Sequence, residues 1–398
     1  MKKAIIHIGA SKLQENSLKW AKSFGLHVVA TDKSANPPSK DIADEFYNID
    51  GKDKVSLLNL ANKITKNFKL IGVYCNSDFS LDAAAEINNK YNLRGCNPHS
   101  LKLSINKNLA KEMMQKVNLP VPRGIVVDEA LLNTYDNKIL SFPLIVKPSD
   151  SSGSQGVKYV ENNKQMKNAI NYSLKFSNKV LLEEFIHGDG VDTIGIMKNG
   201  KLYPCGLASR FFSDLPFRFP THGYTSNLLS KENQKEAYRI TEKAANILGI
   251  FDGPVKADLI FYKNKFTIIE VTPRFHGDVL TNKTITYAYD FNPTKELFSF
   301  LSKGKLSNKS IINLEPKLIL WKALFPLKDN IDWNTLKNDN VSGARILDLF
   351  VDPRFKYNNH IHKDNTSLFG FIFVEFDNLK CMNFYLKNFK SKYKGILI

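Results

Sequence analysis

Residues 255–271 read VKADLIFYKNKFTIIEV, two strand-like apolar runs joined by the short loop KNK at 263–265. Asn264 is a residue type that tolerates left-handed backbone, so this segment predicts a β-hairpin. We expect Tyr262 to face Phe266 across the loop. That register fixes every other pair along the two strands.

The predicted register places Asp258 opposite Glu270 and, further along the same face, Lys256 opposite Thr272. Facing carboxylates repel unless a cation or a basic residue lies between them. Magnesium held by one or two carboxylates and completed by nucleotide phosphate oxygens would explain the pair. A surface hairpin whose solvated acids are neutralised by lysine is the alternative, and the hairpin alone leaves both open.

A second segment, FPLIVKPSDSSGSQGVKYV at 142–160, has a lysine, Lys147, at the end of an apolar strand and a serine- and glycine-rich loop after it. Glycines allow backbone N–H groups to converge on phosphate oxygens, and serine hydroxyls add donors. The loop lacks the Gly-Lys-Ser/Thr of a P-loop. A flexible linker beside an edge-strand lysine is the competing interpretation.

A third segment, KVLLEEFIHGDGVDTIG at 179–195, is a strand that runs into a turn with adjacent acids Glu183 and Glu184. Such a strand end can bind an adenine edge through backbone and side chain, and a later acid can accept from ribose hydroxyls. An exposed acidic strand end would show the same residues.

The first hundred residues alternate apolar runs with amphipathic helical patterns, which predicts a parallel sheet with crossover helices. Gly9 and Asp32 have the spacing of a dinucleotide fold, but the other glycines of that fingerprint are missing. A helical stretch over 100–117 follows. After it we expect an Asn-Gly hairpin at 197–202 and a helix over 231–249.

Composition places the chain among soluble multidomain proteins. The 398 residues are 43% hydrophobic, enough for two or three domains, and no apolar stretch reaches membrane-spanning length. The four cysteines have no paired spacing, which indicates a reducing cytoplasm. The net charge of +17 is spread over lysines along the whole length, so it does not indicate nucleic-acid binding.

The three segments and their order resemble the ATP-grasp superfamily, in the branch that includes biotin carboxylase, carbamoyl-phosphate synthetase and the L-amino acid ligases. The resemblance covers about residues 1–300, beginning with SINKNLAKEMMQKVNLPVPRG at 104–124. It implies an α/β and α+β fold in three parts. These are a Rossmann-like domain at 1–104, an ATP-grasp domain at 105–310 with a lid over about 123–187, and a mixed α/β cap at 311–398.

The resemblance also implies roles for individual residues. Lys107, Lys147 and the loop would contact ATP phosphates, with the adenine held by the strand end and the ribose by an acid. Asp258, Glu270 and Thr272 would hold Mg²⁺, with Mn²⁺ as an alternative, and Arg274 and Lys147 would act in catalysis. The implied nucleotide-binding residues are Lys107, Lys147, Ser151, Ser152, Gly153, Ser154, Gly156, Glu183, Glu184, Phe185, Ile186 and Asp192.

Two positions depart from the family's usual pattern. Thr272 stands where most members have an asparagine, and a hydroxyl is a poorer metal ligand than an amide oxygen. Asp189 competes with Asp192 as the ribose acid, and we choose Asp192. For the acceptor side of the cleft we single out Arg210, His222 and His276; ordinary polar rim residues would look the same.

The resemblance implies a ligase that activates a small-molecule carboxylate as an acyl phosphate and couples it to an amine, with release of ADP and phosphate. Homodimers are common among proteins that resemble this chain. The alternatives are a bicarbonate-using carboxylase, or a nucleotide- or nucleic-acid-binding protein on the same fold. Steep salt dependence of DNA or RNA binding would identify the last of these.

Overall fold

The structure is a computed structural model of the chain. It describes residues 1–128, 139–225, 229–307, 311–328, 331–352, 362–365, 368–393 and 395–397. Helices and strands in these ranges form a mixed α/β architecture around three sheets, as predicted. None of the described helices has the length and apolar character that a membrane span requires.

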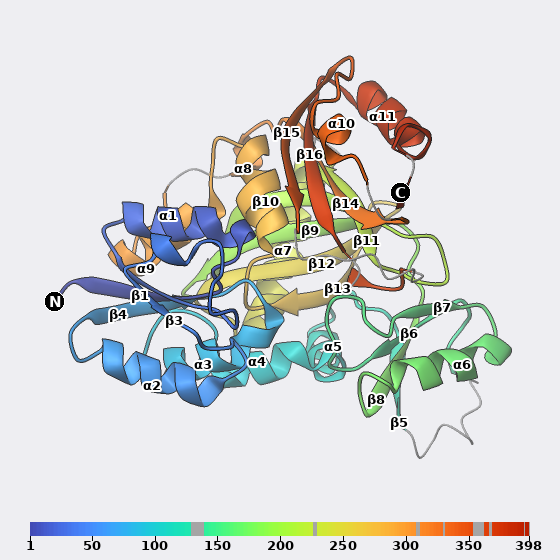
Figure 1. Ribbon diagram of the computed structural model, residues 1–398. Coiled ribbons are helices and arrows are strands. Elements are labelled where there is room, and N and C mark those ends of the chain that lie inside the picture. The colour runs from blue at the N-terminus through green and yellow to red at the C-terminus, as the bar shows by residue number, and fades with distance from the viewer. Residues whose placement is uncertain are drawn as a thin grey trace.

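The N-terminal residues form the parallel sheet that their alternating pattern predicts, with strand order β3-β2-β1-β4. Figure 1 shows α1 above this sheet and α2 and α3 below it. The two faces have separate apolar cores, so both sides of the sheet are covered. The elements are β1 (Lys3–Ile8), α1 (Glu15–Ser23), β2 (His27–Thr31), β3 (Glu45–Tyr47), α2 (Lys54–Ile64), β4 (Lys69–Tyr74) and α3 (Leu81–Lys90).

The helical stretch expected over 100–117 is two helices rather than one. Helix α4 (Pro98–Ile105) ends at Asn106, and α5 (Lys107–Lys116) begins directly after it. The Asn106 side chain accepts a hydrogen bond from the Leu109 N–H, and asparagine is favoured at this capping position. The prediction of one continuous helix was therefore wrong, and the break gives α5 its own start at Lys107.

A small antiparallel sheet, here called the lid sheet, lies beyond α5 at the lower right of Figure 1. Its strand order is β5-β8-β6-β7. Helix α6 packs on β6 and β7 and covers one face. The elements are β5 (Gly124–Asp128), β6 (Leu144–Pro148), β7 (Lys158–Val160), α6 (Asn163–Ser173) and β8 (Lys179–Glu184).

The central sheet contains nine strands in the described part of the chain, in the order β13-β12-β9-β10-β11-β14-β16-β15, with β17 paired to β14. The predicted hairpin at Asn199–Gly200 joins β9 to β10, and the predicted helix α7 (Lys231–Ile247) packs on the sheet. The strands up to the second hairpin are β9 (Asp189–Lys198), β10 (Lys201–Phe212), β11 (Pro220–Thr225), β12 (Gly253–Tyr262) and β13 (Lys265–Thr272).

Residues after 311 continue this central sheet. The added strands are β14 (Leu318–Pro326), β15 (Ala344–Val351), β16 (Gly370–Phe376) and β17 (Ile396–Leu397). Figure 1 shows them in orange and red at the top, next to α10 (Trp333–Lys337) and α11 (Leu379–Lys392). Between the second hairpin and these strands lie the π-helical turn η4 (Val279–Thr284), α8 (Ile285–Ala288) and α9 (Pro293–Lys303). The division into three domains stays a prediction.

Candidate active site

The second hairpin forms as predicted, but its turn is tighter than expected. Tyr262 pairs with Lys265, not with Phe266, so the loop consists of the two residues Lys263–Asn264. Both have positive φ, 47° and 60°, which is the geometry of a two-residue hairpin turn. The predicted register at the turn was therefore wrong by one residue.

The two acids still face each other because a β-bulge shifts the register between the turn and the site. Leu259 pairs with Ile268, but its neighbour Asp258 pairs with Glu270, so Ile269 is the extra residue. A bulge changes how many residues oppose each other without ending the strand pairing. The predicted pairing of the two acids is therefore correct, although the predicted turn was wrong.

Lys256 lies between the two acids. Its Nζ is 2.9 Å from Asp258 Oδ1 and 3.6 Å from Glu270 Oε2. Burial tends to raise the pKa of Glu270, but the charges of Lys256 and Lys107 together outweigh it and hold that pKa below the ordinary value. A basic residue thus compensates the repulsion in the structure as it stands.

Arg210 is the second cation that meets these acids. Its Nη1 lies 3.0 Å from Asp258 Oδ2, and its Nη2 lies 2.6 Å from Asp192 Oδ1. Burial tends to raise the pKa of Asp258, but Arg210 and Lys256 together hold it well below the ordinary value. The role of Arg210 on the acceptor side of the cleft stays a prediction; here its guanidinium is paired with two acids of the protein.

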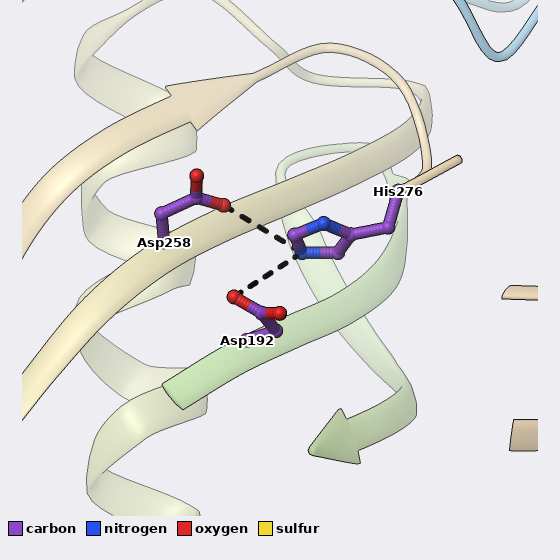
Figure 2. Close-up of side chains that lie close together, drawn as sticks. All are labelled: Asp192, Asp258 and His276. Atoms are coloured by element: carbon purple, nitrogen blue, oxygen red, sulfur yellow. Dashed lines mark ion pairs between the residues drawn. The ribbon is translucent and has the colours of Figure 1, made fainter. Parts of the chain in front are cut away.

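His276 points into the same group. Figure 2 shows its ring directed between Asp192 and Asp258, and Nε2 lies 3.9 Å and 3.7 Å from their oxygens. Arg210 Nη2 donates to the other ring nitrogen, Nδ1, over 3.3 Å. Burial lowers the pKa of His276 well below its ordinary value, which favours the neutral ring. Burial raises the pKa of Asp192 to about 7.

These donors fit a divalent metal at the acid pair. Asp258 and Glu270 offer hard carboxylate oxygens, the ligands that Mg²⁺ prefers. Thr272 follows on the same strand, and its buried Oγ1 has no hydrogen-bond partner among the described residues. Asp192, Asp258 and His276 also have ligand atoms within 4.8 Å of one another, but Arg210 already lies among them.

A cleft, here called the first cleft, runs from the lid sheet to the acid pair. Its empty volume is about 1020 Å³, open solvent included. All the predicted nucleotide-binding residues except Gly156 line it. With Asp258, Glu270 and Arg210, the predicted residues on its wall are Lys107, Lys147, Ser151, Ser152, Gly153, Ser154, Glu183, Glu184, Phe185, Ile186 and Asp192.

A buried charge cluster forms one side of the first cleft. Glu183 lies between two lysines: Lys147 Nζ is 2.7 Å from its Oε2, and Lys111 on α5 is paired with its Oε1. Burial lowers the pKa of Lys147 to about 7, and the nearby Lys107 adds to this effect. An anionic ligand in the cleft would favour the charged form of Lys147.

The serine- and glycine-rich loop closes the end of the first cleft. Three of its residues, Gly153, Ser154 and Gly156, have positive φ of 66°, 62° and 76°. Lys107 Nζ donates to Ser151 O over 2.6 Å, and the Asn365 N–H donates to Gly153 O over 3.2 Å. The chain thus holds the loop from α5 on one side and from the C-terminal part on the other.

The residues that follow β8 form an aromatic wall of the first cleft. Phe185 contacts Tyr159 edge-on with ring centroids 5.1 Å apart, and the Arg218 guanidinium lies 5.3 Å from its centroid. Glu184 Oε1 accepts from the Ser141 N–H over 3.2 Å. A flat, partly apolar ligand such as a purine would fit beside such a wall.

A second cleft adjoins the first and shares with it Ser152–Ser154, Asp192, Arg210, Asp258 and Glu270. It also contains Arg274, whose Nε and Nη2 donate to the two carboxylate oxygens of Asp78 over 2.6 and 2.7 Å. Asp78 lies in the short 3₁₀ turn η3 (Asp78–Ser80) after β4. Arg274 is thus held by the N-terminal part of the chain.

Three residues considered from the sequence lie away from both clefts. His222 on β11 stacks on Phe211 with ring centroids 4.8 Å apart, and it is absent from the described lining of either cleft. Asp189 is exposed at the start of β9. Asp32 accepts from the Ala10 N–H over 2.9 Å and so fixes the turn after β1.

Sequence reasoning missed Lys111 and Asp78. Lys111 is one helical turn after Lys107, and this i, i+4 spacing is a signal that could have identified it. Asp78 has no such signal, because its partner Arg274 is 196 residues away in the sequence.

Parts of this chain are similar in sequence to known proteins. The family described as "D-ala D-ala ligase C-terminus" matches residues 113–273. A formate-dependent phosphoribosylglycinamide formyltransferase of Prochlorococcus marinus is 27% identical over 194 residues, 48% of this chain and 49% of that protein. The chain thus matches about half the length of this relative.

Two solved structures share the fold over nearly the whole chain. An L-amino acid ligase from Bacillus licheniformis has a TM-score of 0.81 and 19% identity, covering 100% of this chain and 98% of that one. An N5-carboxyaminoimidazole synthetase from Staphylococcus aureus, complexed with ADP, has a TM-score of 0.77 and 16% identity, covering 99% and 98%. The chain therefore shares the fold of these two enzymes, and its residues 113–273 are similar to the D-ala D-ala ligase C-terminal family.

Proposed function

We propose that this protein is an ATP-dependent ligase that activates a small-molecule carboxylate as an acyl phosphate and couples it to an amine. The observation that carries the proposal is the acid pair Asp258 and Glu270, which lies where the two clefts meet. One cleft then takes the nucleotide and the other the substrates, with the transferred phosphoryl group between them.

Binding of the triphosphate would use the first cleft. Lys107 and Lys147 supply positive charge, and backbone N–H groups of the loop Ser151–Gly156 supply donors. Phe185 and Ile186 would lie beside the adenine, and Asp192 near the ribose. Asp258, Glu270 and Thr272 would hold Mg²⁺, or Mn²⁺, which when bound neutralises phosphate charge.

The reaction would proceed in two steps. A carboxylate oxygen of the substrate attacks the γ-phosphorus of ATP, the bond to the bridging oxygen breaks, and ADP leaves. The amine nitrogen then attacks the acyl carbon, phosphate leaves with the bonding electron pair, and the nitrogen loses a proton. Arg274 would stabilise negative charge on the reacting oxygens, and closure of the loop would exclude water.

Phosphate release from ATP, measured against a panel of carboxylates and amines, tests the proposal. We expect ADP and phosphate to appear only when a suitable carboxylate is present, and an amide product to form when an amine is added. Release that depends on bicarbonate alone would favour the carboxylase alternative. Gel filtration of the same sample would test the expected homodimer.

A further inference from the structure

The second cleft has two kinds of wall. Its floor consists of the paired charges described above, and another wall is apolar. On this apolar wall Ala323 of β14 pairs with Phe371 of β16, the Trp321 ring contacts the Phe371 ring, and Val279 and Leu280 of η4 adjoin them. The empty volume is about 1290 Å³, open solvent included.

Every lysine and arginine in the described lining of the second cleft already has a carboxylate partner. Arg210 pairs with Asp192 and Asp258, and Lys256 pairs with Asp258. Arg274 pairs through two hydrogen bonds with Asp78, as described above. A phosphate group needs charge-assisted donors, and taking one of these cations away would leave a buried acid unpaired.

The cleft instead contains single polar atoms that lack partners. Asn76 Nδ2 donates to Tyr74 Oη and Asp278 Oδ1, so its carbonyl oxygen Oδ1 is turned the other way and is buried without a partner among the described residues. Trp321 Nε1 and His276 Nε2 are buried without hydrogen-bond partners in the same sense. Buried polar atoms of this kind are rare unless a ligand or water meets them.

Trp321 is held in place by a glycine. Gly223 on β11 pairs with Trp321, and a Cβ atom at Gly223 would lie 2.7 Å from the indole Nε1. The indole therefore lies close against the strand, in a place that only a residue without a side chain leaves open. Its ring also contacts Phe371 edge-on, with centroids 6.3 Å apart.

We propose that the second cleft binds an amino acid with an apolar side chain and no phosphate group. Trp321, Leu368 and Phe371 of the C-terminal part would determine its side-chain specificity. The Asn76 carbonyl would accept from the substrate ammonium group. This inference rests on the proposed function, and it assigns a role to residues after 311 that no motif identified.

ATP-dependent phosphate release with a defined panel tests the inference. The panel contains leucine, methionine and phenylalanine, then aspartate and lysine, and then phosphoribosylglycinamide with formate. We expect release with the apolar amino acids to exceed release with the charged ones by about 10-fold or more in kcat/KM. Preference for phosphoribosylglycinamide would overturn the inference and leave the proposed ligase function standing.

Variants of the wall sharpen the test. Phe371→Ala is expected to change the ratio of kcat/KM between large and small apolar amino acids by about 10-fold, with KM for ATP within about twofold. Trp321→Phe keeps a ring of smaller area, and should change the same ratio by a smaller factor. The control Phe384→Ala, at a side chain 67% exposed on α11, should change neither quantity.

Two outcomes separate the inference from the proposed function. If ATP binds but no apolar amino acid accelerates phosphate release, or if both wall variants affect all substrates equally, the specificity inference is wrong. If ATP itself does not bind to the unmodified protein, the ligase function fails first.

Discussion

Asp258 and Glu270 repel each other, and two nearby cations offset this repulsion. Lys256 and Arg210 compensate the charge in the structure as it stands. Binding of a metal with its nucleotide phosphates would add positive and negative charge together at this place, so the cations need not leave. The side chains at this place are therefore suited to bind a charged ligand.

The first prediction concerns Glu270. Glu270→Gln keeps the size of the side chain but removes one of the two negative charges at the proposed metal site. We expect kcat for phosphate release to fall about 100-fold or more, because metal stabilisation of the transition state amounts to several kcal/mol. Circular dichroism should show an unchanged fold. The control Glu161→Gln, at an exposed acid after β7, should keep full activity.

The second prediction concerns Asp78, a positioning residue that holds Arg274 by two hydrogen bonds. Asp78→Asn removes the charge that fixes the guanidinium, so kcat should fall on the order of 10- to 100-fold with KM for ATP little changed. The matched control is Asp82→Asn, an exposed ion-paired acid on α3. Equal kinetics for both variants would show that Arg274 needs no such support.

At this scale the sequence predicted the residues that lie in recognisable motifs. Asp258 and Glu270 were singled out because they face each other in a hairpin pattern, and Lys147 because it ends a strand pattern before a glycine-rich loop. Asp78 and Lys111 were not, because their contacts join segments that are distant in the sequence or were assigned no chemistry. Long-range ion pairs of this kind have no local signature.

Among the elements, β14 and α11 enclose a lysine charge, and no acid in the described part of the chain forms an ion pair with it. Lys322 is 0% exposed, and its ammonium group has no hydrogen-bond partner among the described residues. Its Nζ lies 4.8 Å from the centroid of the Phe389 ring, a cation–π contact that compensates burial in part. Burial lowers the pKa of Lys322 to about 8.

The third prediction follows from that pKa. Between about pH 8 and the ordinary lysine value of about 10.5, the unfolded chain binds more protons at this side chain than the folded one, so stability rises with pH. Lys322→Met should therefore raise the thermal unfolding temperature at pH 7, and the gain should shrink towards pH 10. Lys380→Met, at an exposed position on α11, should show neither effect. A lower unfolding temperature for Lys322→Met at pH 7 would contradict the account.

Elements with a local signal were predicted well, and those set by tertiary contacts were not. The Asn-Gly hairpin, helix α7 and the parallel N-terminal sheet formed where the patterns indicated. The helix break at Asn106 and the β-bulge at Ile269 were not predicted, because a capping residue and one extra strand residue leave the apolar pattern unchanged. That the strands after 311 extend the central sheet follows from pairing β14 with β11, which no local pattern reveals.

The whole molecule brings three sheets to one place. α5 and the lid sheet meet through Lys111, Glu183 and Lys147, the N-terminal sheet reaches the site through Asp78, and the C-terminal part contacts the loop at Gly153. Each part of the chain thus contributes to the two clefts. A ligand that contacts all of them should stabilise the protein as a unit.

The fourth prediction is that ADP with Mg²⁺ raises the unfolding temperature by several degrees. A ligand at about 100 times its Kd adds about 2.7 kcal/mol to the free energy of unfolding. GDP, which has a different base edge, is the matched control and should give a smaller shift. An equal shift with single-stranded DNA, lost at high salt, would indicate that the charge of +17 is used for nucleic acid instead.

The central claim is that Asp258 and Glu270 together hold the metal that accompanies the triphosphate. Isothermal titration of a non-hydrolysable ATP analogue, with and without Mg²⁺, tests it on the unmodified protein and on Asp258→Asn and Glu270→Gln. We expect Mg²⁺ to tighten binding about 10-fold or more in the unmodified protein and to have little effect in either variant. The same gain from Mg²⁺ in both folded variants would contradict the claim.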